Sequence, residues 1–364
     1  MKRDLYIDFA KGLATLSIIF IHTTFWSGQY YIPTELRVLS LLFDVPIFFA
    51  LSGLTSDGNV EKTLYRLLKL QVTYMIFVTL LFFVDYFFKV FGLYFFGLES
   101  LKNFYATFGS KFVPQSIAYF PQWENLGNWY LHQYSTCDTF PVVMGSFWYL
   151  KVYYILTVLG VLILRFFQQH INWFIALCFG LTLLFNIFPH YYPTGQVGYV
   201  SFYLGVFLVA YKMRGKRIKN SHIPLLYGAL ALVLVWLFWF YGADIFYKIN
   251  KQKFPPKIPY IVWSFLSLMT VFVLYNRLKI TKDNFINYIG KNAIFYYFAQ
   301  GISSSLVYFM VVPLQDNIHW GVLILMVYLV NVISAIFIAE LLKKIDALGW
   351  NTLTWLRRKT ASAG

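Results

Sequence analysis

The sequence predicts an all-α integral membrane protein with about ten transmembrane helices and both termini in the cytoplasm. Of its 364 residues, 59% are hydrophobic and only 12% are charged, whereas a soluble domain has about 25% charged residues. About ten runs approach the roughly 20 mostly apolar residues that a membrane span needs. Aromatic residues reach 22%, and Tyr and Trp are enriched where helices cross the membrane–water interface. We therefore do not expect a water-soluble domain.

The apolar runs give the predicted helices in order. They cover residues 7–26, 36–54, 70–95, 146–166, 173–189, 197–211, 224–243, 259–276, 285–313 and 321–342. Each run is expected to be helical because backbone groups in the hydrocarbon core have no water to bond. The sixth run is short, and the ninth contains Gly290 and Gly301. Since the first run is a full-length span, no cleavable signal peptide is expected.

Basic residues orient these helices. With a cytoplasmic N-terminus, most of the 30 Lys and Arg lie in inner loops and at the chain ends, as the positive-inside rule predicts. One loop disagrees, because four lysines would all face outward: Lys248, Lys251, Lys253 and Lys257. The net charge of +15 then reflects topology and contact with anionic lipids, and no nucleic-acid partner is expected.

Residues 1–345 are predicted to form the transmembrane domain, and residues 346–364 a short basic cytoplasmic tail. Residues 97–145 form a long hydrophilic segment on the outer side, rich in aromatic residues: Tyr105, Phe108, Trp123, Trp129, Tyr130 and Tyr134. Long ordered loops are often binding loops or lids, but a segment resting on lipid headgroups fits equally well. The two cysteines, Cys137 and Cys178, have no spacing typical of a metal site or a disulfide framework, so no metal is expected.

The first predicted helix carries three ionisable residues. Lys11 and His22 are three turns apart on one face, roughly 16 Å along the axis, and Asp8 neighbours Lys11 on that face. Taken singly, Lys11 could snorkel to the headgroups, Asp8 could pair with it, and His22 could be a hydrogen-bonded core residue. Because charges inside a span are costly, the shared face favours a functional role.

The chemistry of these residue types leaves two functions open. Histidine is the side chain best suited to moving protons near neutral pH. A cation at the cytoplasmic mouth can hold a phosphorylated or carboxylated ligand. The pattern therefore fits a donor that enters from the cytoplasm towards a buried base. It fits a proton relay in a transporter as well.

The stretch DFAKGLATLSIIFIH resembles the start of the membrane-bound acyltransferase 3 family, in which a basic residue and a histidine are separated by ten residues. Here these positions are Lys11 and His22. Most members have Arg at the first position, and Lys is typical of a branch similar to fucose 4-O-acetylases. Arg and Lys differ at bidentate phosphate sites, so the contact with the donor is expected to differ from that in most members.

Further stretches resemble family motifs in the same order. DVPIFFALSGL at 44–54 looks like the second helix, YRLLK resembles an Arg-x-x-Arg motif with Arg66 and Lys69, and SFWYL at 146–150 resembles a later Trp-centred helix start. IGKNAIFYYFAQ resembles the Gly-Lys-Asn-Ser segment. It departs at Ala293, where Ser is usual, and at Gln300, where His is frequent.

The resemblance implies a membrane-bound O-acyltransferase of the cytoplasmic membrane that moves acetyl from acetyl-CoA to a hydroxyl of a cell-surface polysaccharide or its lipid-linked precursor. In this hypothesis Lys11, Arg66 and Lys69 bind the coenzyme phosphates, and His22 is the general base or, in a variant, the nucleophile. Asp44 orients the imidazole or is a structural partner of another polar group. The sequence offers no donor for an oxyanion hole. The alternatives are an exporter of polysaccharide or acyl groups and a scaffold in a glycan-assembly complex.

Overall fold

The computed structural model describes residues 4–106, 123–131 and 140–361. Within these ranges the chain forms helices and no strand, which confirms the all-α prediction. Seven helical segments of the described chain are long and apolar enough to cross a membrane, and three shorter apolar helices accompany them: α3 (Pro46–Thr55), α9 (Val197–Met213) and α12 (Ile258–Leu274). The chain is therefore a multi-pass, all-α membrane protein, while ten crossings and cytoplasmic termini stay predictions.

The helices fall into two compact units. The first unit comprises Met1–Phe25, Ile32–Tyr65 and Trp148–Ala293. Besides α3, α9 and α12, its α-helices are α1 (Leu5–Phe25), α2 (Thr34–Ser40), α7 (Trp148–Phe166), α8 (Ile171–Ile187), α10 (His222–Tyr241), α11 (Asp244–Tyr247) and α13 (Phe285–Lys291). Its 3-10 helices are η2 (Gln168–His170), η3 (Pro189–Tyr191) and η4 (Ile249–Gln252).

The core of the first unit depends on close contact between α3 and α9. A Cβ atom added to Gly53 would collide with the backbone carbonyl of Phe207 on α9. Only a residue without a side chain therefore lets the two helices approach this closely. The rings of Phe49 and Tyr203 meet in the same interface at 4.6 Å between centroids. This packing holds α3, and the turn that precedes it, in a fixed position.

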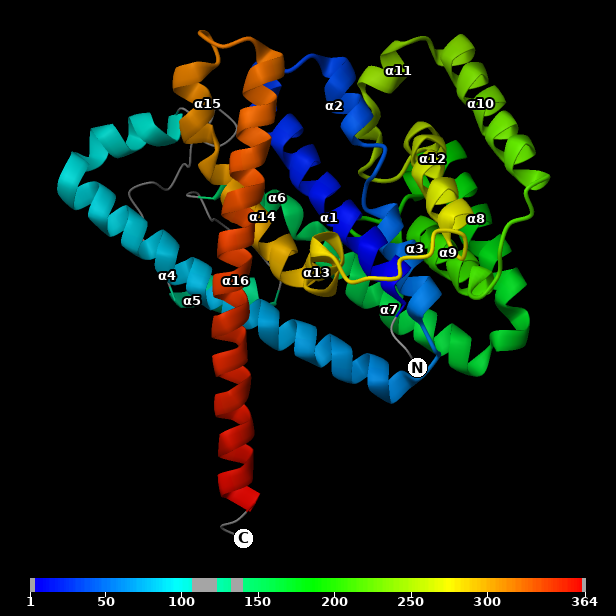
Figure 1. Cartoon of the computed structure of the whole chain (residues 1–364), viewed down its shortest axis with the longest axis horizontal. Coiled ribbons are helices and arrows are strands. Elements are labelled where there is room, and N and C mark those ends of the chain that lie inside the picture. The colour runs from blue at the N-terminus through cyan, green and yellow to red at the C-terminus, as the bar shows by residue number, and fades with distance from the viewer. Residues whose placement is uncertain (1–3, 107–122, 132–139, 362–364) are drawn as a thin grey trace. The chain divides into compact units, whose positions relative to one another are not determined.

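The second unit comprises Trp26–Tyr31, Arg66–Phe147 and Ile294–Gly364. Its elements are η1 (Ser27–Tyr30), most of α4 (Val60–Ala106), α5 (Trp123–Tyr130), α6 (Pro141–Ser146), α14 (Ala293–Leu306), α15 (Tyr308–Leu314) and α16 (Trp320–Ala361). The helix α4 is bent at Gly97, whose φ of 75° is not helical. The last helix continues well beyond the predicted span 321–342, through most of the segment predicted as a tail (Figure 1).

Two predicted spans are wrong as single helices. The run 36–54 is interrupted between α2 and α3, because Pro46 lacks an N–H and its ring would clash with the carbonyl of Leu42 in a continuous helix. Asp44 lies in this turn and not within a helix. The run 285–313 is divided into α13, α14 and α15, and Asn292 leaves the helical conformation between the first two (φ −110°, ψ 18°).

A third predicted span, 70–95, is too short. The helix α4 begins at Val60 because the side chain of Asn59 accepts a hydrogen bond from the backbone N–H of Lys62 (2.8 Å), which caps the first turn. Arg66 and Lys69 therefore lie on a helix and not in a loop. In the aromatic-rich segment Phe108 and Tyr134 lie outside the described residues.

One aromatic residue of that segment, Trp129, is buried within the second unit. Trp129 on α5 is fully buried, and its backbone carbonyl accepts a hydrogen bond from the hydroxyl of Tyr74 on α4 (2.5 Å). The hydroxyls of Tyr130 and Thr79 lie 2.5 Å apart beside it. The helix α5 is therefore anchored to α4 within the second unit.

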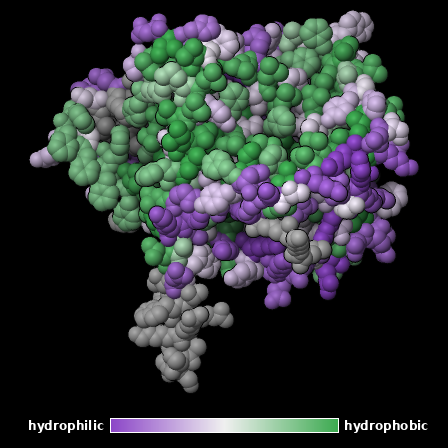
Figure 2. Space-filling model, viewed as in Figure 1, coloured by the Kyte–Doolittle hydropathy of each residue, from purple (hydrophilic) through white to green (hydrophobic). Residues whose placement is uncertain are grey.

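Apolar side chains are exposed over large parts of both units, and Figure 2 shows them across the visible face. On α10 they include Leu232, Val235 and Trp239, and on α16 Leu329 and Phe337. Water-soluble monomers rarely expose such continuous apolar surface. These helix faces fit the hydrocarbon of a bilayer.

Candidate active site

The candidate base and the candidate donor-binding lysine lie on the same helix. Lys11 and His22 are both partly buried on α1, and Asp8 is 4% exposed in the first turns of the helix. The hydroxyl groups of Thr15 and Thr23 are bonded back to carbonyls four residues earlier, at 2.8 Å each. The hydroxyls of Thr15 and Thr23 are therefore satisfied within α1 itself.

The helix α1 is held by α13, which carries the Gly-Lys-Asn segment. A Cβ atom on Gly290 would collide with the carbonyl of Asp8, and one on Gly12 with the carbonyl of Ile286. The side chain of Asn287 also donates to the carbonyl of Leu5 (2.7 Å). The two backbones are thus in direct contact. The Gly-Lys-Asn segment fixes the part of α1 that presents Lys11.

Asp44 is part of a fully buried ion pair. Its carboxylate oxygens lie 2.7 and 2.8 Å from Nζ of Lys253, which is only 6% exposed. The hydroxyl of Tyr260 on α12 donates to Oδ2 (2.8 Å), and the backbone N–H of Val45 donates to Oδ1 (2.7 Å). A buried carboxylate needs these partners, because an isolated buried charge would lose its hydration and gain no hydrogen bond or ion pair in exchange.

His22 lies within electrostatic range of this ion pair. The charges of both Lys253 and Asp44 act on its imidazole within the first unit. Two of the predicted catalytic residues, His22 and Asp44, therefore lie within electrostatic range of each other. Lys253, expected from the sequence in an outward-facing loop, lies within the same range.

Aromatic rings surround the ammonium group of Lys253. Nζ lies 5.5 Å from the ring centroid of Trp148 and 5.4 Å from that of Phe254. Trp148 also contacts Tyr199 and Tyr203, with centroids 5.7 and 6.3 Å apart. Cation–π attraction of this kind stabilises a buried lysine charge by about 1 to 2 kcal/mol. Trp148, in the SFWYL stretch, therefore lines the site.

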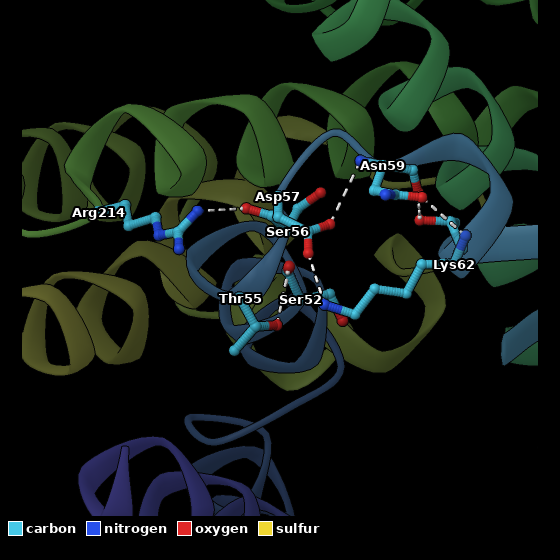
Figure 3. Close-up of polar contacts among 8 residues, drawn as sticks. Ser52, Thr55, Ser56, Asp57, Asn59, Lys62 and Arg214 are labelled. Atoms are coloured by element: carbon cyan, nitrogen blue, oxygen red, sulfur yellow. Dashed lines mark hydrogen bonds and ion pairs between the residues drawn. The ribbon is translucent and has the colours of Figure 1, made fainter. Parts of the chain in front are cut away.

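The turn between α3 and α4 is held by a polar network (Figure 3). Nζ of Lys62 pairs with the carboxylate of Asp57 (2.6 Å), and the side chain of Asn59 caps the first turn of α4. Nη1 of Arg214, which follows α9, donates to the carbonyl of Ser56 (2.8 Å). The first residues of α4, up to Tyr65, belong to the first unit, and this network fixes them within it.

Arg66 and Lys69 follow on α4 by one and two helical turns after Lys62. Both side chains are exposed. Nζ of Lys69 lies 5.7 Å from the ring centroid of Trp350 on α16 within the second unit. Lys11 belongs to the first unit and these two residues to the second, so their joint role in holding one ligand stays a prediction.

The second unit contains a buried polar cluster around Gln300, which stands where family members often have histidine. Nε2 of Gln300 donates to Oγ of Ser146 (3.3 Å), and the hydroxyl of Tyr297 donates to the carbonyl of Ser146 (2.7 Å). On the same helix Ser303 donates to Asn331 of α16 (2.5 Å). An amide at this position holds α14 to α6 without a titratable group.

A family model described as an acyltransferase domain, that of acyltransferase 3, matches residues 4–340. The chain belongs to the acyltransferase 3 family. This membership confirms the resemblance and makes the chain a membrane acyltransferase, but it does not test the likeness to the fucose 4-O-acetylase branch. Searches of the curated proteins and of the solved structures return no match.

Proposed function

We propose that this acyltransferase moves acetyl from acetyl-CoA to a hydroxyl group of a cell-surface polysaccharide or its lipid-linked precursor, in the cytoplasmic membrane. The observation that carries the proposal is the position of His22, on a helix of a membrane acyltransferase and within reach of the charges of Asp44 and Lys253. A general base must act on a hydroxyl that it can reach away from bulk water. A partly buried histidine meets this need.

The donor enters from the cytoplasmic side in this proposal. Lys11 binds its phosphates together with Arg66 and Lys69, whose exposed side chains suit polyanionic ligands. His22 takes the proton of the acceptor hydroxyl while that oxygen attacks the thioester carbonyl. The variant with an acetyl-histidine intermediate makes His22 the nucleophile, and burst kinetics distinguish the two.

The aromatic rings beside the ion pair support a sugar acceptor. Trp148, Tyr199 and Phe254 form one cluster, and the last is 41% exposed. Sugar rings pack their apolar faces on aromatic side chains, while their hydroxyls bond to nearby polar groups. Such a cluster suits a ring whose hydroxyl is turned towards His22.

The test uses purified protein in lipid nanodiscs with radiolabelled acetyl-CoA and surface polysaccharide as acceptor. We expect His22→Ala to lower the transfer rate by at least about 10²-fold, because general base catalysis contributes roughly 10² to 10⁴. His170→Ala, at an exposed histidine of η2, is the matched control and should keep the wild-type rate. Wild-type transfer by correctly folded His22→Ala protein would remove His22 from the mechanism.

The same preparation separates transfer from transport. Reconstituted vesicles that move polysaccharide across the membrane without consuming acetyl-CoA would identify an exporter. Transfer by detergent-solubilised protein, which has no membrane to transport across, supports the proposal. Lys11→Ala should raise the KM for acetyl-CoA while the protein folds normally.

A further inference from the structure

Lys253 is the one lysine of its loop that is buried. Lys248, Lys251 and Lys257 are exposed, whereas Lys253 is 6% exposed and held between Asp44 and two aromatic rings. It follows the 3-10 helix η4, whose residue Ile249 is fully buried and anchors the loop. The loop therefore directs one positive charge into the first unit.

The bonding of Lys253 leaves one donor over. An ammonium group has three N–H donors. One is donated to Oδ1 of Asp44, and Oδ2 lies 2.7 Å from Nζ as an ion-pair contact, so the two carboxylate oxygens occupy at most two donors. The rings of Trp148 and Phe254 also lie beside the ammonium group, at 5.5 and 5.4 Å from their centroids. A ring face attracts the charge but is a weak hydrogen-bond acceptor, so an oxygen of a ligand is the better partner for the third donor.

We propose that Lys253 binds the oxyanion that forms when the acyl thioester is attacked. This inference rests on the proposed acyl transfer at His22, to which the charge of Lys253 already extends. A fixed cation at the carbonyl oxygen acts where negative charge develops, and it needs no reorganisation during the reaction. Lys253 thus supplies the oxyanion donor that the sequence alone does not reveal.

In the proposed step the acyl group moves from the thioester sulfur to the acceptor oxygen. His22 takes the proton from the acceptor hydroxyl as the oxygen bonds to the carbonyl carbon, and the π electrons of the carbonyl move onto its oxygen beside Lys253. The carbonyl then re-forms, the carbon–sulfur bond breaks, and the coenzyme A thiolate leaves with the proton from His22. Lys253 keeps its own proton throughout. The products are the acyl ester and free coenzyme A.

Asp44 and Tyr260 are positioning residues in this mechanism. The carboxylate fixes the ammonium group through a hydrogen bond to Oδ1 and an ion-pair contact to Oδ2, and Tyr260 and the Val45 amide fix the carboxylate. Without this support a lysine side chain has four flexible torsions and no preferred direction. The role of Asp44 is then to aim Lys253, and not to orient the imidazole.

The first test replaces Lys253 by Met and measures kcat and KM. We expect kcat to fall about 10²-fold with little change in the KM for acetyl-CoA, as for the loss of one oxyanion donor. Lys253→Arg should retain more activity than Lys253→Met because it keeps the charge. Lys251→Met, two residues away and exposed, should be unchanged. A kcat within threefold of wild type in Lys253→Met overturns the inference.

A purely structural role would give a different result in the double variant Asp44→Asn with Lys253→Met, which removes both buried charges. If Lys253→Met fails to fold, this double variant replaces it in the test, because it leaves no unpaired carboxylate behind. Recovery of the wild-type kcat would mean that Lys253 only neutralises Asp44. A kcat that stays about 10²-fold low in folded protein supports the inference.

A binding measurement gives a readout that is independent of turnover. Carboxymethyl-CoA carries an anion near the position of the oxyanion, and acetonyl-CoA is its neutral counterpart. We expect Lys253→Met to weaken carboxymethyl-CoA binding at least about tenfold relative to acetonyl-CoA. Equal losses, or no loss, would refute the inference. If the wild-type protein neither binds these analogues nor transfers acetyl, the proposed function fails instead.

Discussion

Replacing Gly290 by Ala tests whether the contact between α1 and α13 positions the active site. The added Cβ would lie within 2.8 Å of the backbone nitrogen of Gly12 and closer still to the carbonyl of Asp8. These atoms would have to move to at least 3.4 Å, where ordinary contact begins. They belong to backbone, so the helices must separate as bodies.

This geometry determines the expected loss of stability and of transfer rate. Overpacking in a core destabilises by about 1 to 3 kcal/mol, and a clash between two backbones lies at the upper end. A displacement of about 1 Å at a catalytic group costs roughly 10²-fold in rate, and α1 carries both His22 and Lys11. We therefore expect Gly290→Ala to lower the unfolding temperature and to reduce acetyl transfer about 10²-fold.

The assay combines thermal unfolding in detergent, followed by tryptophan fluorescence, with the nanodisc transfer assay. The matched control is Gly180→Ala on α8 of the same unit, where a Cβ meets nothing within 4 Å. Alanine is favoured over glycine in a helix by about 1 kcal/mol, so this control should be at least as stable as wild type. Wild-type stability and activity in Gly290→Ala would refute the argument from helix contact.

Three other predictions concern single interactions. Replacing Arg66 or Lys69 by Ala should raise the KM for acetyl-CoA several-fold without changing kcat, as steady-state kinetics will show; a change in kcat alone would contradict a role in donor binding. Lys89→Met should destabilise by about 3 to 5 kcal/mol in a denaturant titration, because it leaves Asp85, its buried partner at 2.9 Å, without that charge; the double change to apolar residues is the control. Asn284→Ala should lower the free energy of unfolding by about 1 kcal/mol, since Asn284 caps α13. An unchanged midpoint in the denaturant titration would argue against the cap.

The sequence predicts the helical membrane fold well because hydropathy and the absence of water in the bilayer leave few alternatives. It predicts breaks in helices poorly. Pro46 is a signal for the turn at Asp44, but it lies inside an apolar run, and hydropathy, which defined the predicted spans, does not register its missing N–H. The family motifs identify Lys11 and His22 by spacing along one helix. Spacing on one helix does not reveal a partner from another part of the chain.

The Asp44–Lys253 pair is a contact that motif spacing along one helix does not predict. The two residues are 209 positions apart, and each taken alone has an ordinary interpretation, one as a helix carboxylate and the other as a loop lysine. The available signal was the conflict itself, since four lysines in a predicted outer loop violate the positive-inside rule.

Burial of Lys253 removes part of the conflict between this lysine-rich loop and the positive-inside rule. A lysine that is neutralised inside the protein exposes no charge to either side of the membrane, so it does not belong in a count of loop charges. Three exposed lysines remain in the loop, and Lys248 is paired with Asp244 at 3.2 Å. The net positive charge that argues against an outward-facing loop is therefore smaller than the sequence suggests. The loop is therefore a weaker objection to the predicted orientation, which stays a prediction.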